Sequence, residues 1–453
     1  MAKDVRSPMD ETTTSQIPHV GPVTGTGSLE AALEHESHVV KRLLKTLGPG
    51  LITGASDDDP SGIGTYATAG ASLGFATLWT APITLPLMAA VQFICAKIGM
   101  VSGMGLAGVL RQHYSRRVLY PAILCLIVAN TINAGADLGA IAAAINLLVP
   151  IPVGVLIVPI ALVIVGLQIW GSYRLIARVF KWLTLALFAY IGAAFFARPD
   201  LAQVLRATFI PSFRADNQYL LTLVAILGTT ISPYLFFWQA SEEVEEEVSM
   251  GRVQLRERQG ATKAELKYAR LDVIIGMFFA NLVFYFVILA SAATLNAAGK
   301  TNIQSATEAA QALRPLAGNA ASVLFAIGLA GSGLLAVPVL VGSSAYAVCE
   351  SFGWQYGLDK KPRGAKHFYV MIVVSIAIGS ALNYLGINPI NALVWTAVIN
   401  GLLAPPLLVV IMFVANNKQV MGEHTNGAWA NALGGLATLA MFAAAGGLLL
   451  TWI

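Results

Sequence analysis

Apolar stretches long enough to cross a lipid bilayer recur along the whole chain. Clear examples are residues 78–98, 153–170, 271–293, 368–385 and 433–452. An α-helix of roughly 20 residues spans about 30 Å of hydrocarbon, so each stretch can cross once. The runs do not alternate apolar with polar residues, as the strands of a membrane β-barrel would. The sequence therefore predicts an all-α polytopic membrane protein embedded in a lipid bilayer.

The composition agrees with this class. Hydrophobic residues make up 56% and charged residues 11% of the chain, whereas a soluble domain has about 25% charged residues. Cys95, Cys125 and Cys349 are isolated from one another, which indicates packing residues and neither a disulfide nor a zinc site. No phosphate-binding Gly-x-x-x-x-Gly-Lys-Ser/Thr motif occurs, so we expect no nucleotide hydrolysis. We also expect no cofactor, no nucleic acid partner and no enzymatic activity.

The apolar pattern resolves into eleven predicted transmembrane helices. They cover about residues 43–72, 76–101, 118–148, 152–171, 174–197, 218–247, 270–296, 319–350, 366–385, 388–415 and 428–452. This number fits two five-helix repeats of opposite orientation followed by one extra helix. Repeat one would cover about 43–197, repeat two about 218–415, and the extra helix 428–452, all within a transporter domain of residues 39–453.

Basic residues in the predicted loops indicate the orientation in the membrane. With the N-terminus inside, the inside loops contain Arg111, Arg116, Arg117, Arg174, Arg178, Lys181, Lys360, Lys361, Arg363 and Lys366. An excess of basic residues in cytoplasmic loops is the usual pattern. Residues 1–38 are polar and lack the apolar core of a signal peptide. We predict a disordered cytoplasmic N-terminal tail, a multi-pass protein of the cell membrane, and a C-terminus outside.

Two of the predicted helices are interrupted near their middle. Residues 48–64 contain Pro60 among several glycines, and residues 225–243 contain Pro233. Proline removes a backbone donor and breaks a helix. Interrupted helices at matching positions in two halves, here one and six, indicate the substrate site of a transporter.

Three aspartates, Asp57, Asp58 and Asp59, precede Pro60 in the first interrupted helix. A carboxylate at the bilayer centre costs roughly 2.5–3.5 kcal/mol on insertion scales, so it needs a cation, a counter-charge or water. Asp59 is the best-placed cation ligand because it adjoins the break, and Asp58 is a candidate for the ion path. The alternative is a helix end that lies in water.

The sixth helix offers oxygen atoms at its own break. Pro233 frees backbone carbonyls, and Thr229, Thr230 and Ser232 carry hydroxyls. Hard cations take such ligands. The alternative is a proline kink whose hydroxyls bond back to their own helix. None of the six histidines falls within an apolar span, which argues against an imidazole-rich site.

Three further polar features lie in or beside apolar helices. Asp137 is a candidate for an ion or proton path, or else a buried carboxylate satisfied by Asn130 or Asn133. Asn400 could complete a coordination shell or bond helix to helix. The acidic run 242–247 is most simply a solvated cytoplasmic extension of helix six; the alternative is an acidic vestibule that concentrates cations.

Several motifs across residues 47–453 form a recognisable set. They are Gly48-Pro49-Gly50, Asp59-Pro60-Ser61-Gly62, Val91-Gln92 with Gly99-Met100-Val101-Ser102-Gly103, Asp137-Leu138 with Asn146-Leu147-Leu148, and Ser232-Pro233-Tyr234. They resemble helices of the NRAMP family of divalent metal transporters. The first two motifs resemble the family's first helix, and the other three resemble its second, third and sixth helices. The resemblance implies a LeuT-type fold with an inverted repeat of five plus five helices, and alternating access around a central metal. It implies that Asp59 is a direct ligand and that Ser56 and Thr229 donate backbone carbonyls.

The chain departs from the family pattern at four positions. Gly62 stands in place of an asparagine ligand, Ser232 in place of a methionine, Tyr234 in place of a histidine linked to proton movement, and Ala140 in place of a glutamate. Without the soft thioether, the site favours hard cations, and magnesium often keeps several of its waters. The departures resemble the NRAMP-related magnesium transporters more than the manganese and iron importers.

The leading hypothesis is a monomeric importer of a divalent metal cation, magnesium or manganese or both, driven by the membrane potential without protons. One alternative is a proton-coupled manganese or iron symporter of the same family, with Asp137 and Tyr234 on the proton path. Another is an amino-acid or organic-solute symporter of the same fold, although residues 57–59 would repel a substrate carboxylate. A receptor or an enzyme would need an extramembrane domain or a catalytic set that the sequence does not contain.

Overall fold

The structure is a computed structural model that describes residues 48–170, 185–303, 305–358 and 360–451. Within these ranges the chain is helical, without a β-strand. The predicted tail, residues 1–38, lies outside the described residues. In the first half the α-helices are α3 (Pro49–Asp57), α4 (Pro60–Leu73), α5 (Thr80–Ser102), α6 (Leu106–His113), α7 (Arg116–Leu148), α8 (Val153–Trp170), α10 (Ala189–Phe196) and α11 (Leu201–Phe209).

The second half continues the same architecture. Its α-helices are α12 (Asn217–Thr230), α13 (Pro233–Ser249), α14 (Leu255–Arg258), α15 (Lys263–Ser291), α16 (Ala306–Ala310), α17 (Arg314–Ala317), α18 (Ala321–Phe352), α19 (Lys366–Leu382), α20 (Pro389–Asn416), α21 (Lys418–Met421) and α22 (Ala428–Leu450). Short 3-10 turns and one π-helical turn join or extend several of them.

Nine segments in the described ranges are long and apolar enough to cross a membrane. They coincide with nine of the eleven predicted helices. The other two are the first, which divides into α3 and α4, and the fifth, of which only the part from residue 185 onward is described. The prediction of an all-α, multi-pass architecture is confirmed.

Both predicted interruptions are present where the prolines place them. Helix α3 ends at Asp57, and Pro60 is the first residue of α4. Likewise α12 ends at Thr230, and Pro233 is the first residue of α13. A proline is tolerated at the first helical position because its missing N–H would have no partner there. Each proline therefore begins a new helix.

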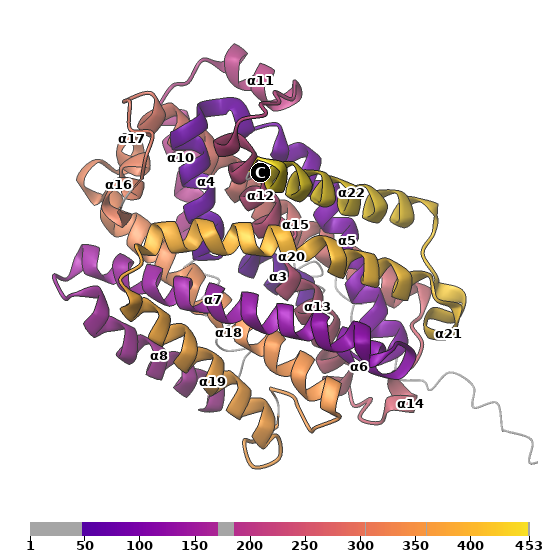
Figure 1. The fold of residues 1–453 in the computed structure, drawn as a ribbon. Coiled ribbons are helices and arrows are strands. Elements are labelled where there is room, and N and C mark those ends of the chain that lie inside the picture. Colours follow the sequence, from indigo (N-terminus) through magenta and orange to yellow (C-terminus); the bar gives the residue numbers. More distant parts are fainter. Residues whose placement is uncertain (1–47, 171–184, 304, 359, 452–453) are drawn as a thin grey trace, which may run out of the picture. The chain divides into compact units, whose positions relative to one another are not determined.

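The interrupted pair α12 and α13 lies at the centre of the bundle, while α8 lies at its edge (Figure 1). Of the most apolar window in the pair, 89% is buried, compared with 28% for α8. Leu162 on α8 and Leu439 on α22 are largely exposed, as expected of side chains that face lipid. Helix α13 packs against α5, α18 and α3, and α4 packs against α15, α20 and α12.

Helix α3 is held in place by a close backbone contact with α15. A methyl group added at Gly54 would collide with the backbone of Gly276, and one added at Gly50 would lie 2.6 Å from the Val273 nitrogen. Small residues at helix interfaces allow backbones to approach closely in membranes. This contact positions the C-terminal end of α3, and with it the first break.

Candidate metal site between the two broken helices

The first break presents a carboxylate held by several donors. Asp59 is the N-cap residue of α4 and accepts a hydrogen bond from the Gly62 amide at 2.7 Å. The Ser61 hydroxyl donates to it at 2.8 Å, and Asn133 Nδ2, from α7, donates to its Oδ2 at 3.1 Å. Free amides and the helix dipole favour a negative charge at a helix N-terminus. These contacts fix the orientation of the Asp59 carboxylate.

The second break presents backbone carbonyls and a serine hydroxyl. Ser232 is the N-cap residue of α13, and its hydroxyl donates to the carbonyls of Gly228 at 2.9 Å and Thr229 at 2.7 Å. The Thr230 hydroxyl donates to the Ile226 carbonyl at 2.9 Å. These hydroxyls do bond back to their own helix, as the kink interpretation expected.

The two breaks face each other. The Tyr234 hydroxyl, on α13, donates to the Ser56 carbonyl of α3 at 2.8 Å. A methyl group added at Gly62 would lie 3.1 Å from Thr229 Oγ1 and 3.3 Å from Asp59 Oδ1. Segments about 170 residues apart in the sequence therefore meet, and the absence of a side chain at Gly62 permits the close approach.

The two carbonyls assigned by resemblance, those of Ser56 and Thr229, each accept a hydrogen bond from a hydroxyl, of Tyr234 and Ser232 respectively. A carbonyl oxygen has two lone pairs, so one remains for another partner. All four residues are buried. The arrangement can present carbonyl oxygens to a cation without leaving their second lone pair unsatisfied.

The aspartate triplet does not lie at a solvated helix end. Asp57, Asp58 and Asp59 are 2%, 6% and 1% exposed. The alternative that placed them in water is therefore wrong. Asp58 Oδ1 has no hydrogen-bond partner among the described residues. Its place on an ion path stays a prediction.

Asp137 lies on α7, one turn after Asn133, and is fully buried. No described side chain donates a hydrogen bond to its carboxylate, and the Ser61 backbone amide and the Asp59 carboxylate are within electrostatic range of it. Asn130 donates to the Leu340 carbonyl at 3.1 Å, and Asn133 donates to Asp59. The interpretation of Asp137 as a carboxylate satisfied by these two amides is wrong.

Asn400 lies on α20, beside Gly401, whose backbone packs against Val224 of α12. Its side chain is buried, and neither amide atom has a partner within the described ranges. An unpaired amide thus lies one helix away from the second break. Its role as a ligand stays a prediction.

The acidic run 242–247 is not the solvated extension that we expected. Glu242, Glu243 and Glu247 are buried within α13, a helix that packs against α5 and α18. Tyr346 of α18 donates from its hydroxyl to Glu245 at 3.1 Å. A run of acids is usually a solvated face, and only the tertiary packing reverses that here.

The candidate ligand atoms at the two breaks are oxygens. Among the described residues, no group of three or more His, Cys, Asp or Glu side chains is arranged to hold a metal. What the breaks offer is one oriented carboxylate, two carbonyls and hydroxyls. Hard divalent cations such as magnesium, calcium and manganese take such ligands, and water can complete their shells.

Sequence reasoning missed two residues that touch Asp59. Ser61 donates through its hydroxyl and Asn133 through its amide. The signal for Asn133 was its spacing of four residues from Asp137, which places both on one face of α7. The sequence alone suggests Asn133 only as a partner for Asp137.

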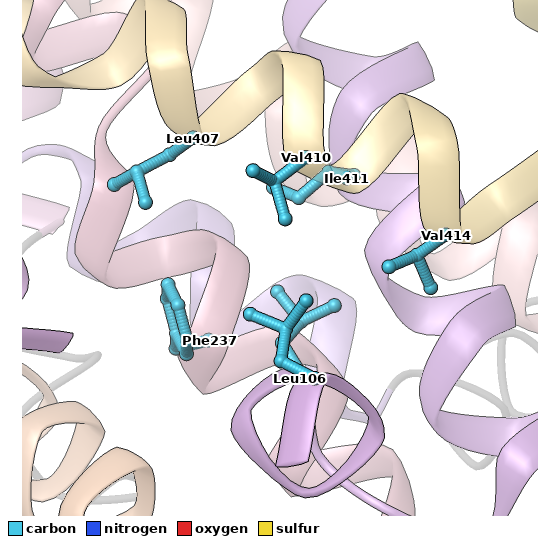
Figure 2. Close-up of a pocket in the computed structure, with 7 residues that line it drawn as sticks. Leu106, Phe237, Leu407, Val410, Ile411 and Val414 are labelled. Atoms are coloured by element: carbon cyan, nitrogen blue, oxygen red, sulfur yellow. The ribbon is translucent and has the colours of Figure 1, made fainter. Parts of the chain in front are cut away.

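An apolar pocket lies between α6, α13 and α20. Leu407, Val410, Ile411 and Val414 of α20 line it opposite Phe237 and Leu106 (Figure 2). These side chains offer no polar atom to a cation. The pocket suits hydrocarbon, and we assign it no part in the metal site.

Comparison with known proteins decides the family. A family model described as natural resistance-associated macrophage protein-like, NRAMP, matches residues 50–451. The chain belongs to this family. It is 28% identical to the divalent metal cation transporter MntH of Deinococcus radiodurans, over 84% of either chain. It is 27% identical to MntH of Vibrio campbellii, over 87% of this chain and 89% of that one.

Solved structures show the same fold. The Eremococcus coleocola manganese transporter superposes with a TM-score of 0.71 at 20% identity, covering 90% of this chain and 87% of that one. Mhp1, a nucleobase-cation-symport-1 transporter, gives 0.55 at 16% identity, covering 89% and 90%. The predicted LeuT-type fold is thereby confirmed, and so is the family resemblance. Since the NRAMP relatives are named as transporters, the prediction that the chain is not an enzyme is confirmed too.

Proposed function

We propose that this protein carries a divalent metal cation across a membrane by alternating access, with Asp59 as its anionic ligand. The observation that supports this most is the buried Asp59 carboxylate, fixed between two helix breaks by Gly62, Ser61 and Asn133. No Lys, Arg or His of the described chain lies within salt-bridge distance of it. A buried carboxylate is costly without a cation partner, and a cargo cation would supply one.

The proposed ligand set is Asp59, the carbonyls of Ser56 and Thr229, and the hydroxyl of Ser232. Because Gly62 carries no side chain, it supplies no ligand of its own, and we propose that water completes the shell. We propose magnesium or manganese as cargo, since both accept an all-oxygen shell with water. Manganese is also the metal named for the structural relative from Eremococcus coleocola.

We propose import driven by the membrane potential. A potential of 100 mV is worth about 2.3 kcal/mol per charge, hence about 4.6 kcal/mol for a divalent cation. This corresponds to roughly 2,000-fold accumulation at equilibrium. No proton is required for that driving force, and Tyr234 replaces the family's histidine.

A specific observation favours a second candidate, proton-coupled symport. Asp137 is buried, accepts no hydrogen bond from any described side chain, and lies within electrostatic range of Asp59. A buried carboxylate of this kind is a default candidate for a proton relay. Coupling through Asp137 would make proton entry accompany each cation.

The experiment is uptake of magnesium and manganese by proteoliposomes at an imposed potential, with a pH dye inside. We expect uptake of at least one of the two ions, dependent on the potential and without acidification. Uptake with acidification would select the symport candidate. Absence of any divalent uptake by protein that is folded and inserted would contradict the proposed function.

A further inference from the structure

A line of polar side chains continues from the second break along α13. Ser232 is followed on the same face by Gln239, two turns later, and then by Glu243 and Glu247 at four-residue steps. Gln239, Glu243 and Glu247 are 0%, 6% and 4% exposed. Three polar groups, two of them acids, are thus buried on the face that begins at the proposed metal site. They form what we call the α13 polar row.

The row runs alongside α3. At one end the row begins at Ser232, whose hydroxyl donates to the Thr229 carbonyl of the second break, and α13 packs against α3. At the other end Asp272 of α15 accepts hydrogen bonds from the first amides of α3 and lies within electrostatic range of Glu243. The row therefore leads from the breaks toward the N-terminal end of α3.

Several oxygen atoms of the row lack a hydrogen-bond donor or a basic side chain among the described residues. Gln239 Nε2 donates to Glu243 Oε1 at 2.8 Å, which leaves Gln239 Oε1 beside the acids, buried and without a partner in the described ranges. Arg252 lies 3.6 Å from Glu247 but also pairs with Glu265 at 2.5 Å. Neither Glu247 oxygen accepts a hydrogen bond from a described residue. No described Lys, Arg or His lies within 4 Å of Glu243.

An amide oxygen and two carboxylates within about two turns of one helix form a ligand set for a hard cation. Residues four apart on a helix have Cβ atoms about 5–6 Å apart, close enough for their side chains to share an ion. Burying such a set without a cation costs several kcal/mol. A bound divalent cation would remove that cost and would supply the missing partner of Gln239 Oε1.

We propose that the α13 polar row is a second divalent-cation site, which receives the cargo after it leaves Asp59. Gln239 Oε1 and Glu243 are its ligands, Glu247 adds negative charge one turn further, and water completes the shell. The proposal rests on the proposed function for the identity of the cargo. It makes the buried row a second binding site on the release path of the cargo.

The test is a count of bound manganese ions on the purified full-length protein by electron paramagnetic resonance, in which bound ions lose the six-line signal of free ions. We expect two ions on the wild type, one on Asp59→Asn, one on Glu243→Gln and none on the double variant. The Glu243→Gln change keeps an acceptor for Gln239 Nε2 and removes only the charge. We expect it to weaken the second site by at least about 10- to 100-fold.

The control is Glu423→Gln, which removes the same charge from an exposed position and should leave two ions bound. Two ions on Glu243→Gln, or a single site on the wild type that Asp59→Asn abolishes, would overturn the second site and leave the proposed function intact. Retention of both sites by Asp59→Asn would overturn the proposed Asp59 site instead. The two failures are therefore distinguishable.

Discussion

Asp272 of α15 caps the N-terminus of α3, and its replacement by Asn should loosen that helix. Its carboxylate accepts hydrogen bonds from the amides of Gly48 at 3.0 Å, Gly50 at 2.7 Å and Leu51 at 3.2 Å. Asn keeps one acceptor oxygen but replaces the other with an NH2 group and removes the charge, so at least one hydrogen bond to a charged group, worth about 1.5–3 kcal/mol, is lost. We therefore expect α3 to lose about 2–3 kcal/mol of stability against local opening.

The assay is amide hydrogen exchange of the peptide that covers residues 48–57. Local opening free energies set the exchange rates, so a loss of about 2–3 kcal/mol should speed exchange by roughly 30- to 150-fold. The matched control is Asp216→Asn, which alters another capping aspartate, bonded to the Tyr219 amide at 2.9 Å, and should not affect this peptide. Unchanged exchange at α3 in Asp272→Asn would refute the capping argument, whereas faster exchange throughout would indicate global destabilisation.

Two further predictions concern the second break. Ser232→Met would add a thioether beside the Thr229 carbonyl. Because sulfur favours softer metals, we expect the ratio of cadmium to magnesium uptake to rise roughly tenfold, which corresponds to about 1.4 kcal/mol. An unchanged ratio in competition assays would place Ser232 outside the coordination shell. Tyr234→Phe removes the hydroxyl that donates to the Ser56 carbonyl. We expect a loss of about 0.5–1.5 kcal/mol of stability, with cation uptake retained. Complete loss of uptake in a variant with a near-normal Tm would mean that the hydroxyl takes part in transport.

The parts of the fold that could be predicted are those encoded locally. Pro60 and Pro233 break helices through their own chemistry, so the breaks and the position of Asp59 were readable from the sequence. The length of the apolar runs likewise gave the helices. Their pairing across the bundle was available only through the family resemblance.

The sequence predictions that failed concern residues whose partners lie in distant segments of the chain. The burial of Glu243 results from packing of α13 against other helices, which no local charge pattern reveals. The Asn133 amide donates its hydrogen bond to Asp59, a residue 74 positions away, and not to Asp137 on its own helix. The Asp272 cap joins residues more than 220 positions apart. Side chains of this kind acquire their partners only when the helices assemble.

The most direct test of the account is cation uptake by Asp59→Asn beside Asp58→Asn, each in proteoliposomes at the same membrane potential. A unit charge 4 Å from another contributes about 4 kcal/mol at an effective dielectric of 20, and a divalent cation more. We therefore expect Asp59→Asn to weaken cation binding by about 1,000-fold or more and to abolish uptake. Uptake by Asp58→Asn should remain measurable. Normal uptake by Asp59→Asn would contradict the account, because the carboxylate fixed between the two breaks would then not hold the cargo.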